Sequence, residues 1–211
     1  GGFNAYNVLP VFAVASILKL PIEKIITGLE RVAIIPGRME IIQEDPFTVI
    51  VDYAHEKVSL TLLLNTIIER KKGNEKIILV MGAEGGGRDV TKRPEMAKIV
   101  AEKANYLVVS NCDPYDDDPM SIINDIAHHA VTYGMKPNKN LFLIEERGTG
   151  IEKAISLANK NDFVLIIGKG AEQNIVIKDK KIPWDDRVIA RRALKKMNNI
   201  SNPQAPTEKY H

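Results

Sequence analysis

The stretch FVLIIGKG (163–170) is a short apolar run, rich in β-branched residues, that ends in glycines. Four other runs have the same character and also end in polar or glycine-containing residues: FTVIVDY (47–53), KIILVMG (76–82), YLVVSN (106–111) and LFLIEE (141–146). Segments with helical periodicity separate the five runs, at 58–71, 92–104, 119–133 and 148–159. Continuous apolar strands that alternate with helices are typical of a parallel sheet covered on both faces. The sequence therefore predicts an α/β domain of Rossmann-like type, with a mostly parallel sheet.

The segments on either side of this pattern differ in character. Before Pro36-Gly37, apolar residues recur at helical spacing in 8–20 and again after Pro21, so two helices are expected there. After Glu172, the sequence predicts a hairpin that turns at 179–180 and a last helix that begins at Asp185 or Asp186. The end is polar and has no apolar period, so we expect it to be disordered. The expected divisions are 1–37, 38–197 and a tail at 198–211.

The composition excludes several classes of protein. Of the 211 residues, 45% are hydrophobic, and 29 basic against 27 acidic side chains give a net charge of +2. This balance gives no reason to expect a nucleic-acid partner. A single cysteine excludes an internal disulfide and a cysteine-cluster metal site, and it fits a cytoplasmic location. No apolar run approaches the roughly 18 residues of a membrane span, so we expect a soluble protein with no membrane partner.

Polar residues follow each predicted strand. In parallel sheets, ligands bind beyond the carboxyl ends of the strands, so the residues at these positions are expected to line one site. They are Asp52 to His55, the loop GAEGGGRD (82–89), the stretch NCDPYDDDP (111–119), Arg147, and Gly168 to Glu172.

The glycine-rich loop at 82–89 leaves a predicted strand and enters a helix. It lacks the Gly-Lys-Ser/Thr ending of a P-loop, and its glycine spacing does not match the dinucleotide-binding pattern. Arg88, Lys92 and Arg93 stand beside the glycines, which favours anion binding over a purely structural turn. An arginine here would suit a carboxylate, which it can bind with two parallel hydrogen bonds.

The acidic stretch 111–119 lacks the alternating oxygen ligands and central glycine of a calcium loop. Asp118 before Pro119 predicts a helix N-cap, which leaves Asp113 and Tyr115 for ligand recognition. Glu172 is a candidate acceptor for a substrate ammonium. No second ligand stands at metal spacing from His55, so no metal site is predicted.

The motifs FNAYN, PGRME, VDYAH, GGGRDVTKRPEM, DPYDDDP, GKGAE and DDR occur here in this order. Their combination resembles the Mur ligase family, over residues 3 to about 195. The likeness is strongest to the members that add the third residue of the peptidoglycan stem peptide to UDP-N-acetylmuramoyl-L-alanyl-D-glutamate.

The resemblance implies both a fold and a function. Members have an N-terminal domain for the UDP-sugar, a central P-loop domain for ATP and Mg²⁺, and a Rossmann-like C-terminal domain that delivers the amino acid. This chain would then hold the last helices of the central domain and the whole C-terminal domain, and we expect it to be a fragment that is inactive alone. Its partners would be the UDP-sugar dipeptide, a diamino acid and the upstream domains of the same ligase.

The resemblance also implies roles for single residues. Asn7, Arg38 and Asp52 would contact the nucleotide. Arg88 would hold the α-carboxylate of the amino acid, and Gly168 and Glu172 would complete its site. The recognition tetrapeptide Asp-Asn-Pro-Arg, typical of members that use diaminopimelate, falls on Cys112, Asp113, Pro114 and Tyr115.

This tetrapeptide is where the chain departs from the family pattern. The family's arginine meets the far carboxylate of diaminopimelate, and Tyr115 cannot form that ion pair. A lost charge-assisted hydrogen bond is worth roughly 1.5 to 3 kcal/mol, or about ten- to hundredfold in affinity. Asp113, Asp116 and Glu172 suit an ammonium, so we expect lysine or ornithine. Diaminopimelate stays open, because Tyr115 can still donate one hydrogen bond and Lys169 or Arg147 could take the place of the missing arginine.

Two other classes stay open on the sequence. A folylpolyglutamate or cyanophycin synthetase-like ligase would share the α/β domain. A stand-alone amino-acid-binding module is the second alternative, and tight binding of an amino acid without the rest of a ligase would distinguish it.

Overall fold

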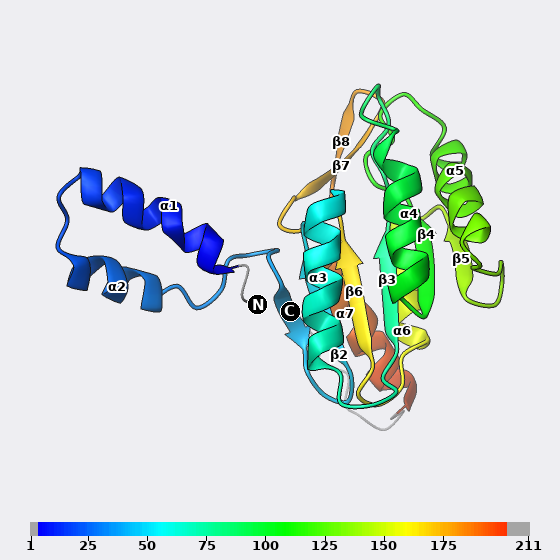
Figure 1. Cartoon of the computed structure of the whole chain (residues 1–211). Helices are drawn as coiled ribbons and strands as arrows, with labels where there is room; N and C mark the ends of the chain where they lie inside the picture. Colours follow the sequence, from blue (N-terminus) through cyan, green and yellow to red (C-terminus); the bar gives the residue numbers. More distant parts are fainter. Residues whose placement is uncertain (1–3, 202–211) are drawn as a thin grey trace, which may run out of the picture. The chain divides into compact units, whose positions relative to one another are not determined.

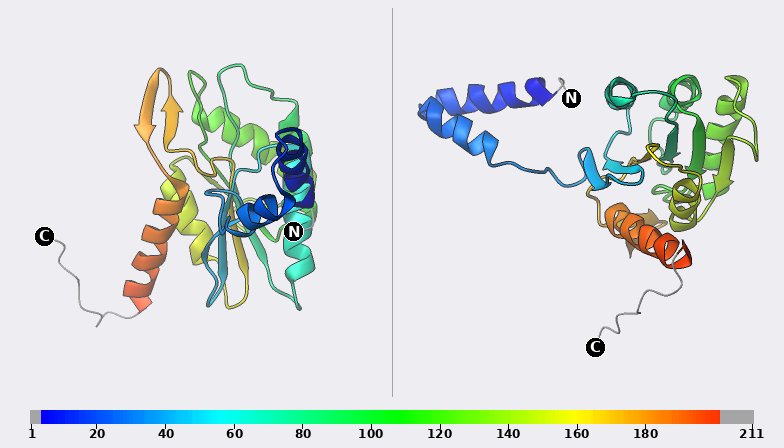
Figure 2. Two further views of the ribbon diagram at one scale, coloured as in Figure 1. Left: turned by 90° about the vertical axis from the view of Figure 1, so that its left-hand side faces the viewer. Right: turned by 90° about the horizontal axis from the view of Figure 1, so that it is seen from below.

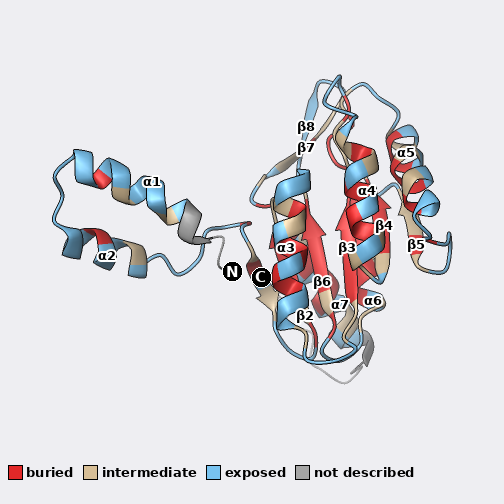
Figure 3. Ribbon diagram, in the orientation of Figure 1, coloured by how far each residue is buried: buried red, intermediate tan, exposed pale blue. Residues whose placement is uncertain are grey.

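The computed structural model describes residues 4–201. The chain divides into two compact units, Gly1–Pro36 and Gly37–His211, and the division falls one residue before the boundary expected from the sequence. The first unit holds α1 (Asn4–Ile17) and α2 (Ile22–Glu30), and α2 begins directly after Pro21. Most side chains of these two helices are exposed, as Figure 3 shows, including large apolar ones such as Ile17 at 80%.

The second unit is built on a six-stranded sheet with the order β1-β2-β6-β3-β4-β5 (Figure 1). All neighbours pair in parallel except β1 with β2, which is antiparallel. The predicted mostly parallel sheet is therefore confirmed, although the edge strand β1 was not foreseen. The strands are β1 (Glu40–Gln43), β2 (Thr48–Asp52), β3 (Ile77–Met81), β4 (Tyr106–Ser110), β5 (Leu141–Ile144) and β6 (Phe163–Ile167).

Helices cover both faces of this sheet, as the right-hand view of Figure 2 shows. Strand β3 shows why a strand of this sheet is apolar throughout. Ile77 and Leu79 belong to one buried cluster and Ile78 and Val80 to the other, so successive side chains enter opposite layers of the core. One layer holds α3 (Lys57–Arg70), α4 (Lys92–Lys103) and α5 (Pro119–Thr132), and the other holds α6 (Arg147–Ser156) and α7 (Asp186–Ser201).

Carboxylates begin two of these helices. The Asp118 side chain accepts a hydrogen bond from Ser121 N, and Pro119 is the first helical residue of α5, which confirms the predicted cap. Glu146 accepts hydrogen bonds from the backbone N–H groups of Gly148 and Thr149 at the start of α6.

The C-terminal part contains the expected hairpin, formed by β7 (Asn174–Ile177) and β8 (Lys180–Pro183). Helix α7 continues to Ser201, so residues 198–201 are helical and their assignment to a disordered tail was wrong. The rest of that tail, 202–211, lies outside the described residues. Among the described helices, none is long and apolar enough to cross a membrane.

Candidate functional site

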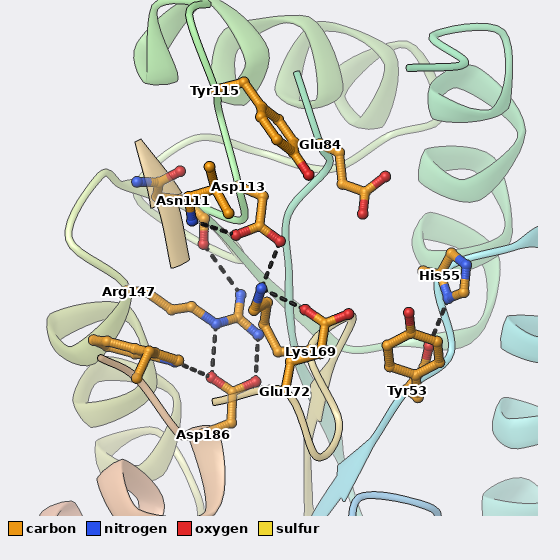
Figure 4. Close-up of polar contacts among 12 residues, drawn as sticks. Tyr53, His55, Glu84, Asn111, Asp113, Tyr115, Arg147, Lys169, Glu172 and Asp186 are labelled. Carbon is orange, nitrogen blue, oxygen red and sulfur yellow. Dashed lines mark hydrogen bonds and ion pairs between the residues drawn. The ribbon is translucent and has the colours of Figure 1, made fainter. Parts of the chain in front are cut away.

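Side chains from the loops after β2, β3, β4, β5 and β6 lie together at the carboxyl edge of the sheet (Figure 4). The parallel pairing brings these strand ends to the same edge, as the sequence predicts. Residues 111–118, which follow β4, form what we call the recognition loop. The labelled residues are Tyr53, His55, Glu84, Asn111, Asp113, Tyr115, Arg147, Lys169, Glu172 and Asp186.

The recognition loop has an unusual backbone that the β7–β8 hairpin holds in place. Asp113 and Tyr115 have φ angles of 44° and 52°, in the left-handed region that few non-glycine residues adopt. Tyr115 N donates to Val176 O at 3.2 Å, and Lys178 N donates to Tyr115 O at 2.7 Å. Val176 N donates to Asp113 Oδ1 at 2.7 Å. The β7–β8 hairpin therefore holds Tyr115 through its backbone and Asp113 through its side-chain carboxylate.

The glycine-rich loop packs against the recognition loop from the other side. Gly85 N donates to Asp113 O at 3.0 Å, and Gly86 N donates to Asp117 Oδ2 at 3.1 Å. A Cβ atom at Gly85 would lie 2.2 Å from Pro114 O, so only glycine permits this approach. Two of the backbone N–H groups that were expected to bind an anion thus hold the recognition loop.

All three cations beside these glycines have a carboxylate within 4 Å, but only Lys92 and Arg93 form short ion pairs. Lys92 Nζ lies 2.8 Å from Glu56 Oε1, and Arg93 Nη1 lies 3.0 Å from Asp125 Oδ2. The Arg88 side chain is 57% exposed, and its guanidinium still has donors to offer. Arg88 is therefore the residue of this loop that is best placed to bind a carboxylate.

Arg88 lies against the side chain of Tyr115. Its Nη2 donates to the tyrosine hydroxyl at 3.3 Å, and its Cζ lies 5.6 Å from the ring centroid. Glu84 Oε2 lies 3.8 Å from Arg88 Nε. The hydrogen bond to Tyr115, followed by the charge of Glu84, raises the pKa of Arg88. Tyr115 thus orients the guanidinium with its hydroxyl and ring.

Lys169 lies between two carboxylates at the centre of the group in Figure 4. Its ammonium forms ion pairs with Asp113 and Glu172, and its side chain is only 1% exposed. Burial lowers the pKa of Lys169, but the hydrogen bonds to Asp113 and Glu172 outweigh that effect and raise it overall. Asp113, expected to contact the amino acid, is buried and uses both oxygens within the protein. The Glu172 side chain is 35% exposed and remains accessible.

A second buried ion pair lies below this group. Arg147 Nε and Nη2 donate to the two carboxylate oxygens of Asp186 at 2.8 and 2.7 Å. Nη2 also donates to Ile167 O at 2.9 Å and Nη1 to Asn111 O at 3.3 Å, so Arg147 joins the ends of β6 and β4. Trp184 Nε1 donates to Asp186 Oδ1 at 2.8 Å. Burial opposes the charged form, but the charge of Asp186 raises the pKa of Arg147 overall.

These two ion pairs engage both cations that the sequence offered in place of the missing arginine. Arg147 and Lys169 are each 1% exposed in their side chains and committed to protein carboxylates. The expectation that either could take the place of the missing arginine was therefore wrong. The pairing of Arg147 with Asp186 was not foreseen. The available signal was the DDR motif together with a basic residue at the end of a strand.

Cys112 and Pro114 form the buried underside of the recognition loop. Burial raises the pKa of the Cys112 thiol to about 12, so the thiol is neutral at physiological pH. A Cβ atom at Gly168, whose φ is 106°, would lie 3.6 Å from Cys112 Sγ. Cys112 therefore supports the loop as a small neutral side chain.

The residues expected to contact the nucleotide lie in both units. Arg38 and Asp52 belong to the second unit, where Arg38 Cζ lies 4.5 Å from the ring centroid of Tyr53. The Asp52 carboxylate accepts two backbone N–H groups, both at 2.7 Å. Burial raises the pKa of Asp52 against the opposing effect of these bonds. Asn7 lies in α1, in the first unit, and its predicted role stays a prediction.

Known proteins provide an independent comparison. A UDP-N-acetylmuramoyl-L-alanyl-D-glutamate–2,6-diaminopimelate ligase from Halalkalibacterium halodurans is 40% identical over 92% of this chain and 38% of its own length. A UDP-N-acetylmuramyl-tripeptide synthetase from Treponema denticola is 41% identical over 92% of this chain and 36% of its own length. The chain therefore spans less than two fifths of the length of these relatives.

A solved structure of a UDP-N-acetylmuramoyl-L-alanyl-D-glutamate–2,6-diaminopimelate ligase covers 94% of this chain and 39% of its own length. It superposes with a TM-score of 0.68 at 28% sequence identity. The family model for the Mur ligase glutamate ligase domain matches residues 37–170, which run from the start of the second unit through the Lys169 ion pairs. The chain belongs to the Mur ligase family.

Proposed function

We propose that this chain is the amino-acid-delivering part of an ATP-dependent ligase. The ligase would add the third, diamino residue to UDP-N-acetylmuramoyl-L-alanyl-D-glutamate during peptidoglycan synthesis in the cytoplasm. Relatives at 40% and 41% identity whose names state this type of reaction support the proposal. The site at the carboxyl edge of the sheet supplies the residues that would hold the amino acid.

Two exposed groups of opposite charge would orient the substrate. Arg88 is 57% exposed in its side chain and, besides its contacts with Glu84 and Tyr115, keeps donors that could bind the α-carboxylate. Glu172 has an accessible carboxylate for the distal ammonium. A diamino acid carries these two groups at opposite ends, which fits a site with one cation and one anion.

The observation that carries the proposal is the charge of the Lys169 group. Asp113 and Glu172 contribute two formal negative charges and Lys169 one positive charge, so 1 − 2 leaves a net charge of −1. A partly enclosed negative charge favours a cationic ligand, since the low local dielectric strengthens the attraction. An ammonium from the substrate would neutralise this net negative charge.

The same charge and Tyr115 favour a diamino acid without a second carboxylate, such as lysine or ornithine. A distal carboxylate would lie near a net negative group, with a tyrosine hydroxyl in place of an arginine. The described cations below it, Arg147 and Lys169, are already paired. The name of the Halalkalibacterium relative states diaminopimelate, so the choice of amino acid is the part of the proposal that most needs a test.

ATP and Mg²⁺ would be held mainly by the rest of the ligase. The described residues contain no group of three or more His, Cys, Asp or Glu side chains suited to a metal, so we assign Mg²⁺ no ligand in this chain. Apolar side chains of the first unit support a place in a larger domain, because monomeric proteins rarely expose so many. They include Leu9 at 60%, Ile17 at 80% and Leu18 at 65% exposed.

The contribution of this chain to catalysis would be positioning. ATP activates the side-chain carboxylate of D-glutamate as an acyl phosphate, and the amine of the incoming residue displaces phosphate. Arg88 and Glu172 would fix the amino acid at both ends and bring its amine to within about 3 to 3.5 Å of the acyl carbon. Closure of this domain over the nucleotide would then complete the site.

A chimaeric ligase tests this function. In it, this chain replaces the matched C-terminal 196 residues of the Halalkalibacterium ligase. We expect ATP-dependent tripeptide product from the chimaera and none from the chain alone. Arg88→Ala and Glu172→Gln should each abolish most of the product, while Lys180→Ala, on the exposed strand β8, should not.

Three outcomes would contradict the proposal. Product from the isolated chain would show that it is a complete enzyme. Tight binding of an amino acid by the isolated chain, together with an inactive but folded chimaera, would instead favour a stand-alone binding module. Addition of glutamate to a folate substrate by the chimaera would favour the folylpolyglutamate synthase class.

A further inference from the structure

The opposite edge of the sheet carries a second candidate site. A cleft of about 320 Å³ lies where the chain enters β3, β4 and β5. Its lining includes Lys76, Asn105, Tyr106, Lys136, Lys139 and Asn140. We call it the amino-edge cleft. A strand of five residues spans roughly 16 Å, which separates this cleft from the site at the carboxyl edge.

The lining of the cleft carries three lysines and no carboxylate. Lys76, Lys136 and Lys139 form no ion pair with any described residue, and no carboxylate belongs to the lining. The carboxylates of Glu75 and Asp162 lie near Lys76 and are engaged by backbone groups: Glu75 accepts the N–H groups of the turn before it, and Asp162 accepts Lys76 N at 2.7 Å. Lys136 and Lys139 are exposed, whereas Lys76 is half-buried against Tyr106, so three lysines give the cleft an excess of positive charge.

The neutral polar side chains of the cleft add donors. Asn105 Oδ1 accepts from Ile77 N at 2.9 Å, and Asn140 Oδ1 accepts from Lys136 N at 2.7 Å. Both amides use their oxygen in the protein, which leaves the Nδ2 groups to donate outward. Tyr106 accepts from Lys76 Nζ at 3.5 Å, so its own proton is free to donate. A lining made of donors selects for an anion.

We infer that the amino-edge cleft binds a small anion that carries phosphoryl groups. Its volume is at the lower end of small-molecule sites, and multiply charged phosphoryl oxygens match an array of ammonium and amide donors. Lys76 Nζ lies 5.4 Å from the ring centroid of Tyr106 and occupies its face, so stacking of a base on that ring does not drive recognition. The phosphoryl group itself is the recognised element, whether it belongs to a soluble ester or to a lipid headgroup.

Inorganic pyrophosphate is the probe for this site. Titration into the ¹⁵N-labelled chain should move the amide signals of 76, 105–106, 134–136 and 138–140, and calorimetry should give a saturable affinity. The double variant Lys136→Ala/Lys139→Ala should weaken binding by at least about tenfold. Lys180→Ala/Lys181→Ala removes the same charge from exposed strand β8 and should leave the affinity unchanged, because the two places lie beyond a Debye length of about 8 Å.

Three results would overturn the inference. They are the absence of saturable binding, equal weakening by both double variants, and signal changes confined to the carboxyl-edge loops. Unchanged ¹⁵N spectra away from the substitutions show that each variant is folded. Flotation with phosphatidylglycerol vesicles then separates the two sources: vesicle binding that the Lys136/Lys139 variant loses indicates a headgroup, and pyrophosphate binding without vesicle binding indicates a soluble ester.

Discussion

The two edges of the sheet carry charge in different ways. At the carboxyl edge, Arg147 and Lys169 are almost fully buried and each is paired with carboxylates. At the amino edge, Lys76, Lys136 and Lys139 surround an open cleft and are unpaired among the described residues. A buried charge is tolerable only with a partner, whereas an exposed lysine costs little without one. Charges at the carboxyl edge therefore support the structure of a site, and those at the amino edge remain available to a ligand.

The largest predicted effect of a single change is the loss of the Arg147–Asp186 pair. Asp186→Ala leaves a buried guanidinium without its partner and should reduce the free energy of unfolding by about 3 to 5 kcal/mol. Urea unfolding followed by circular dichroism measures the change. Lys57→Ala is the matched control, because its pair with Glu95 is exposed and should cost at most about 1 kcal/mol. Similar values for both variants would contradict the contrast between the edges.

Lys169→Met should have the next largest effect. It leaves Asp113 and Glu172 without their shared cation, and we expect a loss of about 2 to 3 kcal/mol in the free energy of unfolding. The loss should be smaller than that of Asp186→Ala because Glu172 is 35% exposed and water can solvate it. Addition of Asp113→Asn should recover part of the loss, since it removes the buried one of the two negative charges. A double variant less stable than Lys169→Met would refute the ion-pair explanation.

Cys112 predicts a dependence of stability on alkaline pH. Its pKa is raised by burial from 9.0 to about 12, so the unfolded chain loses this proton first as the pH rises. The contribution of the buried, protonated thiol to the free energy of unfolding is fully present below pH 9 and is lost between pH 9 and about 12. By pH 10, deprotonation of the unfolded chain should already have lowered the free energy of unfolding by roughly 1 kcal/mol.

Cys112→Ala removes this titration. The wild type should therefore lose part of its stability advantage over Cys112→Ala as the pH rises. The smaller side chain adds a cost that does not change with pH. The pKa of Lys169 is also raised, but its hydrogen bonds to Asp113 and Glu172 remain in the variant, so most of its contribution cancels in the difference. A difference that stays constant across this range would show that the thiol is not buried as described.

The smallest change is expected at the amino edge. Lys136→Ala/Lys139→Ala should alter the free energy of unfolding by no more than about 0.5 kcal/mol, because both side chains are exposed and unpaired. Thermal unfolding at low and high salt measures it. A loss as large as that of Lys169→Met would mean that these lysines are structural and would remove the contrast between the edges.

The sequence predicts the layers of the fold better than the details of the site. Strand β3 shows why: alternate side chains of one apolar run fill two cores, so strand and parallel sheet are visible in the residue types. The left-handed φ angles of Asp113 and Tyr115 have no such signal, because neither residue is glycine. Both residues are held by hydrogen bonds with the β7–β8 hairpin. For Asp113 the donor is Val176 N, 63 residues later in the chain.

The ion pairs were equally hard to predict. Lys169 and Asp113 are 56 residues apart, and Arg147 and Asp186 are 39 apart. A sequence shows that these residues stand at strand ends, but it does not show which cation is buried and which remains free for a substrate. The structure shows that Arg147 and Lys169 are buried and that Arg88 is accessible.

We propose that Tyr115 and the negatively charged Lys169 group select a diamino acid without a second carboxylate. The direct test measures kcat/KM of the chimaeric ligase, with and without Tyr115→Arg, for lysine, ornithine and meso-diaminopimelate. The account predicts that the unaltered chimaera prefers lysine or ornithine, and that Tyr115→Arg shifts the ratio toward diaminopimelate by about ten- to hundredfold. A clear preference of the unaltered chimaera for diaminopimelate would contradict it.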